Sequence, residues 1–312
     1  MNKTKIAILA ASCLKGIGLY RINRLIESIV LSKKLKHQDI DYFELIEIGI
    51  QEQIFSEMLP ISYFLEGYRK AENILEQCQQ KQIHIAIPFD ENFPNLLKFG
   101  HELTVHYRDC PPILFYQGDL SIFNEGECVA VIGTRSPSQE GYRANEKIAS
   151  CLAQNHMTVV SGLAIGCDSA AHQGCLKMEG HTAAFLPSPI DCILPISNRQ
   201  LAEDILSQGG CLLSEYPTQK DVFQVQNYHY IQRDRLQAMS SMAVVTSEFD
   251  KKSGTVHTLR YAKQYQKPVY ALQSMVSSGH IPLDFFEEEG IALNLFNTPE
   301  EMIEQLKKSP IR

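Results

Sequence analysis

The chain has 312 residues, of which 44% are hydrophobic and 21% are charged, and its formal net charge is −7. This composition is typical of a globular protein and excludes a disordered, collagen-like or disulfide-dense chain. The length allows one large domain with one or two smaller ones. Because the net charge is negative, the chain as a whole does not attract nucleic acid, and any contact with DNA has to use a local basic site.

The nine cysteines stand singly, without a C-x-x-C pair. Most lie within apolar runs, which is typical of reduced core residues in a cytoplasmic protein and gives no pattern of metal ligands. The apolar stretch at residues 6–13 is too short to span a membrane, and no signal-peptide cleavage site follows it. We therefore expect a cytoplasmic protein with no membrane contact, no metal and no other cofactor.

Residues 1–82 have apolar side chains at helical spacing, as between Ile22 and Ile29, which predicts a small helical domain. The turn at 16–18 has two glycines and fits a SAM-like or helix–hairpin–helix domain, in which glycine amides can approach a phosphate. A plain turn between two helices explains these glycines better than a DNA contact. Residues 83–127 contain two short strand-like runs and several turns, and we expect an extension that leads into the main domain.

From residue 128 onward, short apolar runs alternate with helical segments. The expected strands are 129–132, 158–160, 182–186, 211–213, 242–245 and 269–272, and the expected helices are 142–154, 169–178, 201–206, 236–240 and 258–266. This alternation predicts an α/β fold over residues 128–297, a Rossmann-like parallel sheet with helices on both faces. Residues 298–312 are expected to form a C-terminal helix and tail. Ligands of such sheets bind beyond the carboxyl ends of the strands, so the loops there carry the candidate site.

The loop Gly133-Thr134-Arg135-Ser136 directly follows the first of these strands. Glycine lets a backbone approach a ligand, the hydroxyl groups and the next helix N-terminus offer donors to an anion, and arginine suits a phosphate. These residues favour an anion-binding site over a structural turn with a solvated arginine.

The next loop, residues 161–172, begins with Ser161-Gly162 and is not a G-x-G-x-x-G dinucleotide motif. Asp168 is expected to cap the following helix, with an ordinary or lowered pKa, and His172 lies on the same helix face. An Asp–His pair can be catalytic, but a helix cap and a buried polar histidine are commoner. We therefore expect both residues to orient the loop and expect no catalytic residue.

Together these segments resemble the DNA-processing protein A (DprA/Smf) family. Its successive motifs match V-I-G-T-R at 131–135, S-G-L-A-x-G-x-D-x-A-A-H at 161–172, S-E-Y-P at 214–217 and S-G-T at 253–255, and P-P-x-L-F-x-x-G-D-L at 111–120 matches the segment before the family's main domain. The motifs follow the family's order and spacing, and the resemblance covers about residues 6–297.

The resemblance implies that the chain binds single-stranded DNA over the strand carboxyl ends, recruits RecA in natural transformation, forms a homodimer and is not an enzyme. The residues expected at DNA phosphates are Gly133, Thr134, Arg135, Ser136, Ser161, Gly162, Arg233, Arg235, Ser253, Gly254 and Thr255. Tyr228 or Tyr230 is expected to stack on bases without reading their sequence. Apolar candidates for the dimer interface, which core packing would explain equally well, are Ile281, Leu283, Phe285, Phe286 and Ile291.

The chain departs from the family near the expected DNA surface. The family usually has F-P-x-R-N-R, whereas this chain has Tyr230-Ile231-Gln232-Arg233-Asp234-Arg235, with a carboxylate in place of the asparagine. An ion-paired cluster of the two arginines with Asp234 is therefore an alternative to phosphate contact.

Two other functions stay open. A nucleotide-binding or nucleotide-cleaving enzyme similar to the LOG phosphoribohydrolases would use the same phosphate loops, but the P-G-G-x-G-T-x-x-E motif of those enzymes is absent. A divergent paralogue that assembles with partners and binds no DNA would fit the negative net charge.

Overall fold

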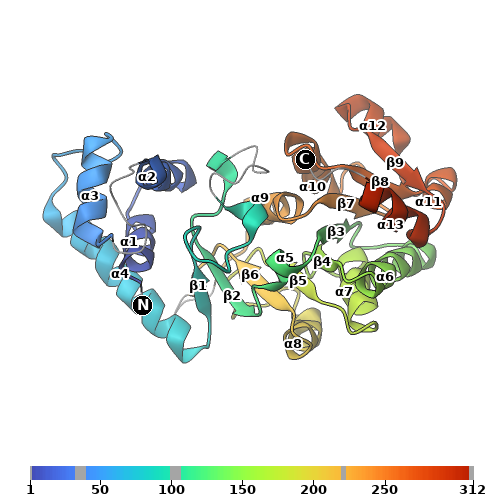
Figure 1. Cartoon of the computed structure of the whole chain (residues 1–312), viewed down its shortest axis with the longest axis horizontal. Helices are drawn as coiled ribbons and strands as arrows, with labels where there is room; N and C mark the ends of the chain where they lie inside the picture. Colours follow the sequence, from blue (N-terminus) through green and yellow to red (C-terminus); the bar gives the residue numbers. More distant parts are fainter. Residues whose placement is uncertain (1, 32–39, 99–106, 219–222, 309–312) are drawn as a thin grey trace.

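The computed structural model of the chain describes residues 2–31, 40–98, 107–218 and 223–308. Its first part is a helical domain at one end of the molecule (Figure 1). The helices of this domain are α1 (Lys3–Ser12), α2 (Leu19–Leu31), α3 (Tyr42–Gln51) and α4 (Ile61–Gln80). Within the described residues, no helix is long and apolar enough to cross a membrane.

The rest of the chain is built on one nine-stranded sheet with helices on both faces, which confirms the predicted α/β fold class. Its parallel strands are β3 (Cys128–Ile132), β4 (Thr158–Ser161), β5 (Thr182–Phe185), β6 (Cys211–Ser214), β7 (Ala243–Thr246), β8 (Val269–Leu272) and β9 (Leu293–Phe296). The strand order is β1-β2-β6-β5-β4-β3-β7-β8-β9, so the chain reverses its direction of winding at β3. Ligand sites form beside such a reversal, because the connections on its two sides leave to opposite faces of the sheet.

The helices that follow these strands have the bounds α6 (Gln139–Gln154), α7 (Cys167–Leu176), α8 (Arg199–Ser207), α9 (Asn227–Met239), α10 (Thr255–Gln264), α12 (Leu283–Glu289) and α13 (Pro299–Lys308), with the short α5 (Ile122–Glu125) and α11 (Gln273–Ser277). Strand β3 shows how both faces are buried. Val129 and Val131 belong to the core that includes Ile148 of α6, whereas Ala130 and Ile132 belong to the core that includes Leu236 of α9.

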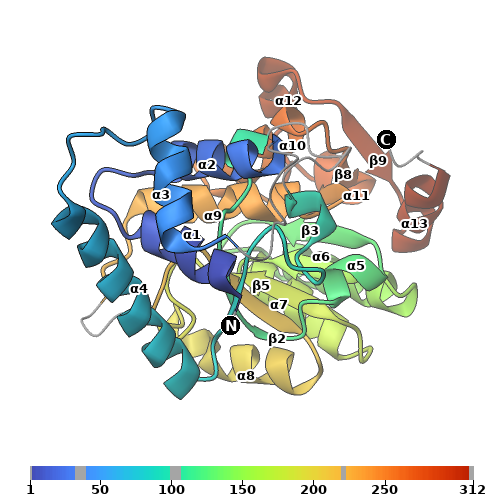
Figure 2. The same ribbon diagram turned by 60° about the vertical axis from the view of Figure 1, so that its left-hand side comes forward.

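Residues 83–127, expected as an extension, add two strands to the same sheet. The strands are β1 (His84–Ala86) and β2 (Leu114–Gly118), and both run antiparallel to their neighbours at the β6 side. The sheet as a whole is therefore mixed, whereas its strands within residues 128–297 are all parallel, as predicted. The helical domain shares a core with β5 and β6, because Ile26 and Phe64 belong to the same buried cluster as Ala184 and Leu212 (Figure 2).

The last segments also belong to the main body. In α13, Met302, Ile303 and Leu306 are buried against the core around β3. Four of the five apolar residues expected at a dimer interface are buried in the chain's own core as well. These four are Ile281, Phe285, Phe286 and Ile291, and only Leu283 is exposed.

Candidate nucleic-acid interface

A cavity of about 500 Å³ opens beyond the carboxyl ends of β3 and β4, where the sequence predicted the site. It lies between the loops after these strands, the N-terminus of α10 and one side of α9. Of the predicted residues, Gly133, Thr134, Arg135, Asp168, Arg233, Ser253, Gly254 and Thr255 line it. The structure therefore brings together residues from four sequence segments that are up to 122 positions apart, from 133 to 255.

The loop after β3 is held in place through its backbone. The Thr134 amide donates to the Glu248 carbonyl at 2.8 Å, and the Cys167 amide donates to the Thr134 carbonyl at 3.0 Å. The Glu248 carboxylate also accepts hydrogen bonds from the backbone amide and the hydroxyl of Ser138, the N-cap of α6. Glu248, which the sequence analysis did not single out, therefore positions the loop that carries Arg135.

Arg135 is exposed at the rim of the cavity. Its guanidinium lies over the ring of Tyr230 from α9, 4.7 Å from the ring centroid. A cation in this position is oriented by the ring yet stays open to solvent and to an anion. Lys252 is a second exposed cation on the cavity lining, and the sequence analysis did not place it at the site.

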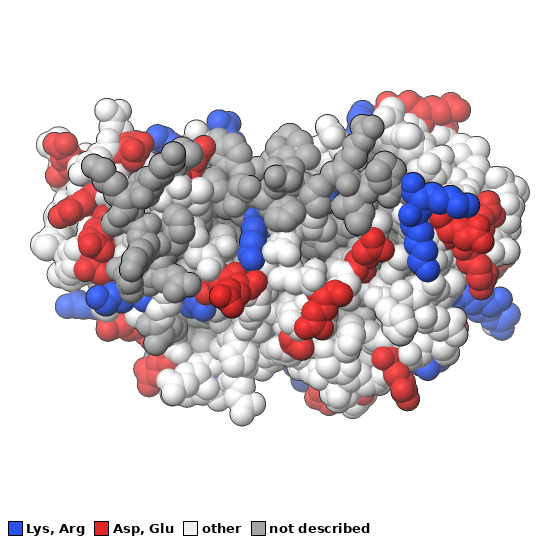
Figure 3. Space-filling view, viewed as in Figure 1, with Lys and Arg blue, Asp and Glu red and all other residues white. Residues whose placement is uncertain are grey.

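On the face seen in Figure 3, basic and acidic side chains are interspersed and form no single continuous basic surface. The lining of the cavity has more basic than acidic side chains. Its lining includes three cations, Arg135, Arg233 and Lys252, and two carboxylates, Asp168 and Asp234. The positive charge needed for a DNA contact is therefore local, as the negative net charge requires.

Arg235 does not reach the cavity, so its predicted phosphate contact is wrong. It is only 2% exposed and binds Glu215 through two hydrogen bonds, Nη1 to Oε2 at 2.9 Å and Nη2 to Oε1 at 2.7 Å. Its Nε donates to the Asp109 carbonyl at 2.7 Å. The alternative of an ion pair is right for this arginine, but the partner is Glu215 of the S-E-Y-P motif and not Asp234.

Arg233 is also buried, but it forms part of the cavity floor. Its Nε lies 3.2 Å from Asp234 Oδ1, and its Nη1 lies 3.8 Å from Asp168 Oδ2. The amide oxygen of Gln237, in the orientation that satisfies both partners, accepts from Nη1 at 2.5 Å. The alternative of an ion-paired arginine beside Asp234 therefore describes Arg233 correctly.

Ser161 and Gly162 serve packing. The Ser161 hydroxyl is fully buried and donates to the Val131 carbonyl at 2.7 Å. The predicted contact between Ser161 and a DNA phosphate is therefore wrong. A Cβ atom on Gly162 would lie 1.1 Å from Arg233 Nη1. The absence of a side chain at 162 therefore makes the space that the Arg233 guanidinium occupies. Ser136 is exposed but does not line the cavity.

Asp168 is not the helix cap that the sequence predicted. Helix α7 begins at Cys167, and its N-cap is Gly166, which has a φ of 83° and makes no side-chain cap hydrogen bond. The Asp168 carboxylate instead faces Arg233 and accepts a hydrogen bond from the Ala164 amide at 3.4 Å. Burial raises the pKa of Asp168 against the opposing effect of Arg233, so the expected ordinary or lowered pKa is also wrong.

His172 contacts the neighbouring strand β5. Its Nδ1 lies 2.7 Å from the Thr182 hydroxyl on β5. Burial, with a smaller effect from Arg233, lowers the pKa of His172 to about 3, so the ring is neutral near pH 7. The residue ties α7 to the sheet.

The N-terminus of α10 supplies the remaining wall. Gly254 is exposed, and a Cβ atom added there would meet nothing within 4 Å. The Ser253 hydroxyl is buried and has no hydrogen-bond partner among the described residues. The positive end of the helix dipole and these small residues suit an anion at the rim.

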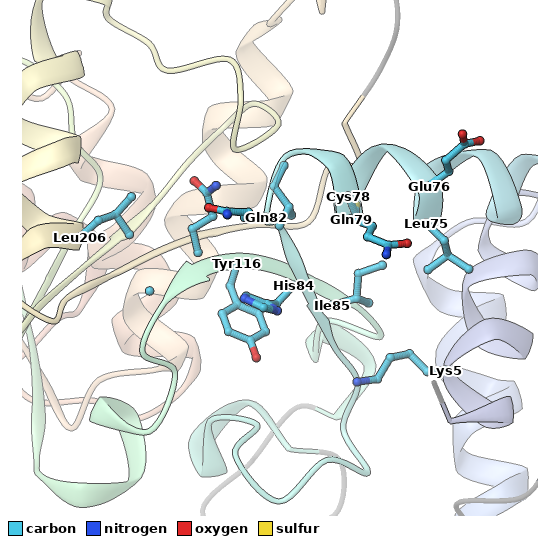
Figure 4. Close-up of a pocket in the computed structure, with 13 residues that line it drawn as sticks. Lys5, Leu75, Glu76, Cys78, Gln79, Gln82, His84, Ile85, Tyr116 and Leu206 are labelled. Carbon is cyan, nitrogen blue, oxygen red and sulfur yellow. The ribbon is translucent and has the colours of Figure 1, made fainter.

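A larger cavity, of about 1160 Å³, lies between α4 and the strands β1 and β2 (Figure 4). Its lining includes one lysine, Lys5, and that ammonium pairs with Asp90 at 2.9 Å. The rings of His84 and Tyr116 pack on each other there with centroids 5.3 Å apart. This cavity therefore offers neither a free cation for phosphate nor a cluster of the motif residues.

Comparison with known proteins agrees with the geometry. A sequence model of the family described as DNA recombination-mediator protein A matches residues 84–289. The chain belongs to this family. It is 33% identical over 270 residues to the protein Smf of Synechocystis, covering 85% of this chain and 63% of that protein, and 32% identical over 248 residues to the protein Smf of Escherichia coli, covering 78% and 62%. The chain thus spans about three-fifths of the length of these curated relatives.

Two solved structures have the same architecture. The DNA processing protein A of Streptococcus pneumoniae matches with a TM-score of 0.72 at 24% identity, over 98% of both chains. That of Helicobacter pylori matches with a TM-score of 0.59 at 27% identity, over 73% of this chain and 96% of its own, and is described as having a unique single-stranded DNA binding mode. In this member of the family, the segment 230–235 contacts two other motifs: Arg235 pairs with Glu215 of S-E-Y-P, and Arg233 occupies the space above Gly162.

The space above Gly162 can be tested by substitution. We expect Gly162→Ala to displace the buried Arg233 guanidinium and to lower the free energy of unfolding by about 1–3 kcal/mol, as overpacking of a full interior does. Gly254→Ala is the matched control and should change this free energy by less than about 0.5 kcal/mol, because its Cβ meets open space. Urea denaturation of the three proteins measures both values. Equal stability of wild type and Gly162→Ala would contradict the packing role.

Asp234 should make stability depend on pH. Burial raises its pKa to about 7, with Arg233 acting in the opposite direction and Asp168 adding to the rise. In the unfolded chain its pKa is about 3.9. Because the folded pKa is the higher one, the stability that neutral Asp234 contributes is complete below the unfolded pKa and is lost as the pH rises through about 7. Asp234→Asn, which stays neutral, should therefore gain stability relative to wild type across this range.

The measurement is the free energy of unfolding of both proteins at several pH values between about 5 and 8, a range that brackets the folded pKa. Glu203→Gln, which removes an exposed carboxylate of α8, is the control and should follow wild type throughout. Parallel curves for wild type and Asp234→Asn would show that Asp234 titrates as an ordinary surface carboxylate.

Proposed function

We propose that the chain binds single-stranded DNA across the rim of the cavity at the strand carboxyl ends, protects it, and hands it to RecA in natural transformation or recombination. The observation that carries this proposal is the combination of exposed Arg135 and Lys252 with the N-terminus of α10 around one opening. Membership of the recombination-mediator family and the likeness to the Helicobacter pylori protein support it. A cytoplasmic location follows from this role.

The rim suits a phosphate backbone for electrostatic reasons. The cations on the rim are exposed, whereas the carboxylates of Asp168 and Asp234 are buried in the floor. A phosphate is attracted to the first group and repelled by the second, so the backbone runs over the opening. Tyr228, which is 54% exposed, and Tyr230 on α9 are available for bases to stack on.

The chain should also form a homodimer through the Rossmann-like domain. Within the part of the chain that the structure describes, β9 is the last strand of the sheet, and Leu283 on the nearby α12 is exposed. Both support this proposal, because an unpaired strand edge can pair with another chain. Sedimentation at about 50 µM, where a dimer with a micromolar dissociation constant is populated, is the test. Wild type should sediment as a dimer, and a monomer at that concentration would sink the proposal.

A second candidate is nucleotide cleavage, favoured by one observation. Asp234 lines the cavity with its pKa raised by burial to about 7, which is where a general acid or base operates near neutral pH. Incubation with nucleoside monophosphates decides between the two functions. Release of free base that Asp234→Asn abolishes would establish the enzyme, and the binding function predicts no release.

The DNA-binding proposal predicts that Arg135→Ala weakens the affinity for single-stranded oligonucleotides by about 1.5–3 kcal/mol, the value of a charge-assisted phosphate contact. Its unfolding free energy should fall by less than about 1 kcal/mol, because the Arg135–Tyr230 contact is at the surface. Fluorescence anisotropy with single-stranded and duplex oligonucleotides gives the affinities, which should favour the single strand and fall with salt.

Arg143→Ala is the matched control, since Arg143 is an exposed arginine of α6 that does not line the cavity. It should bind as wild type does. No binding by wild type even at low salt would refute the DNA-binding function and favour a paralogue that binds no DNA. Equal weakening by both variants would show that the contact is a general charge effect and not a site at Arg135.

A further inference from the structure

The floor of the cavity has groups that a phosphate contact does not use. Asp234 is only 6% exposed, yet it lines the cavity. Its Oδ1 faces Arg233 Nε, and within the described chain no hydrogen bond reaches its Oδ2. Arg233 uses Nε and Nη1 for Asp234, Asp168 and Gln237, and among the described residues its Nη2 donates no hydrogen bond. An acceptor and a donor on adjacent residues are therefore left for a ligand.

The chemistry of this pair selects the kind of group that can enter. At about pH 8, where Asp234 is ionised, a phosphate is excluded, because two carboxylates against one buried guanidinium leave the floor negative. A nucleobase is neutral and carries both donors and acceptors on its edge. The cavity volume of about 500 Å³ accommodates a nucleotide, and Ile132, Tyr230 and Ile231 provide apolar walls for the faces of a planar ring.

Among the bases, guanine complements the pair most fully. Its Watson–Crick edge presents two adjacent donors, N1–H and the N2 amino group, that one carboxylate can accept together, and next to them the O6 acceptor, which a guanidinium can reach. Thymine presents one N–H between two carbonyl oxygens, and both oxygens would face the Asp234 carboxylate unfavourably. Cytosine and adenine offer one amino group and are intermediate.

We propose that Asp234 and Arg233 read a guanine base inserted into the cavity, either from a strand of DNA whose phosphates lie on the rim or from a free guanine mononucleotide. The DNA form of this inference rests on the proposed single-stranded DNA binding. It departs from binding without sequence readout, which phosphate contacts alone would give. Asp234 is the specificity-determining residue, because an asparagine there would present one donor and one acceptor and would lose the match to two adjacent donors.

The experiment uses the full chain and measures affinity at about pH 8, where Asp234 is ionised because its pKa is near 7. The probes are an oligothymidine and the same oligonucleotide with a single guanine, cytosine or adenine at its centre. The guanine oligonucleotide should bind about ten-fold more tightly than oligothymidine, which is near the lower end for one bidentate base contact. Competition with dGMP and with dTMP, together with direct calorimetric titration of the protein with each nucleotide, tests the free nucleotide.

Asp234→Asn should abolish the preference for guanine, because it removes the two adjacent acceptors that match guanine and also the carboxylate that faces the thymine oxygens unfavourably. Glu203→Gln is the matched control, because it removes one negative charge from the exposed surface of α8 and should retain the preference. The preference in wild type tests the proposal even if Asp234→Asn does not fold.

The possible outcomes distinguish a failure of base reading from a failure of DNA binding. Tight binding of all oligonucleotides without a guanine preference, together with equal competition by dGMP and dTMP, would overturn base reading and leave the DNA-binding function intact. No binding of any oligonucleotide would refute that function. In that case, selective binding of dGMP would support the free nucleotide as the ligand, and its absence would overturn the inference. A preference that Asp234→Asn retains would also overturn it.

Discussion

The burial of Arg233 and Arg235 inside ion pairs is the constraint on which the carboxyl end of the sheet depends. A buried guanidinium is stable only if carboxylates and carbonyls replace its hydration, since removal of one partner of a buried pair costs about 3–5 kcal/mol. Arg235 meets this requirement through Glu215 after β6 and through the Asp109 carbonyl. It therefore fastens α9 both to the end of the sheet and to the segment that precedes β2.

Arg233 is two positions earlier and faces a different side of α9, toward the loops after β3 and β4. Its position requires Gly162 to lack a side chain and requires Asp168 to turn toward it from α7. Helix α9 is thus bound to the end of the sheet through Arg235 and contributes to the cavity floor through Arg233. The cavity floor is therefore formed by the buried Arg233 and the carboxylates that neutralise its charge.

The sequence predicted the parts of this arrangement that apolar patterning specifies. Parallel strands buried on both faces are continuous apolar runs, so β3 to β8 and the position of the site at their carboxyl ends followed directly. Helix α9 was predicted only for residues 236–240, although it begins at Asn227. Its first two turns contain polar and charged residues, because this helix buries arginines and a carboxylate where most helices bury leucines. Once its start is known, Tyr230, Arg233, Asp234 and Gln237 fall on one face at helical spacing.

The remaining errors have the same physical origin. The sequence analysis predicted that the motif residues contact a ligand, whereas in the structure several of them pack against neighbouring loops. Gly133 leaves room for Cys167, and Gly166 adopts a positive φ against the backbone of Thr134 and Arg135. Local spacing also suggested that Asp168 caps α7, but spacing cannot show that a guanidinium 65 positions later, at residue 233, draws the carboxylate away. Pairings of this kind depend on tertiary structure and leave no periodic signal in the sequence.

The distribution of charge around the cavity explains how an acidic protein can suit a polyanion. In the proposed binding mode, the exposed cations of the rim attract the phosphates, and salt screens the negative surface elsewhere beyond roughly 10 Å at moderate ionic strength. The carboxylates are withdrawn into the floor, where the low dielectric strengthens their interaction with Arg233 and keeps their charge away from the backbone path. Phosphate and base would then meet opposite charges at different depths of one opening. That separation allows a single site to combine attraction for the backbone with discrimination between bases, and neither group of charges could provide both alone.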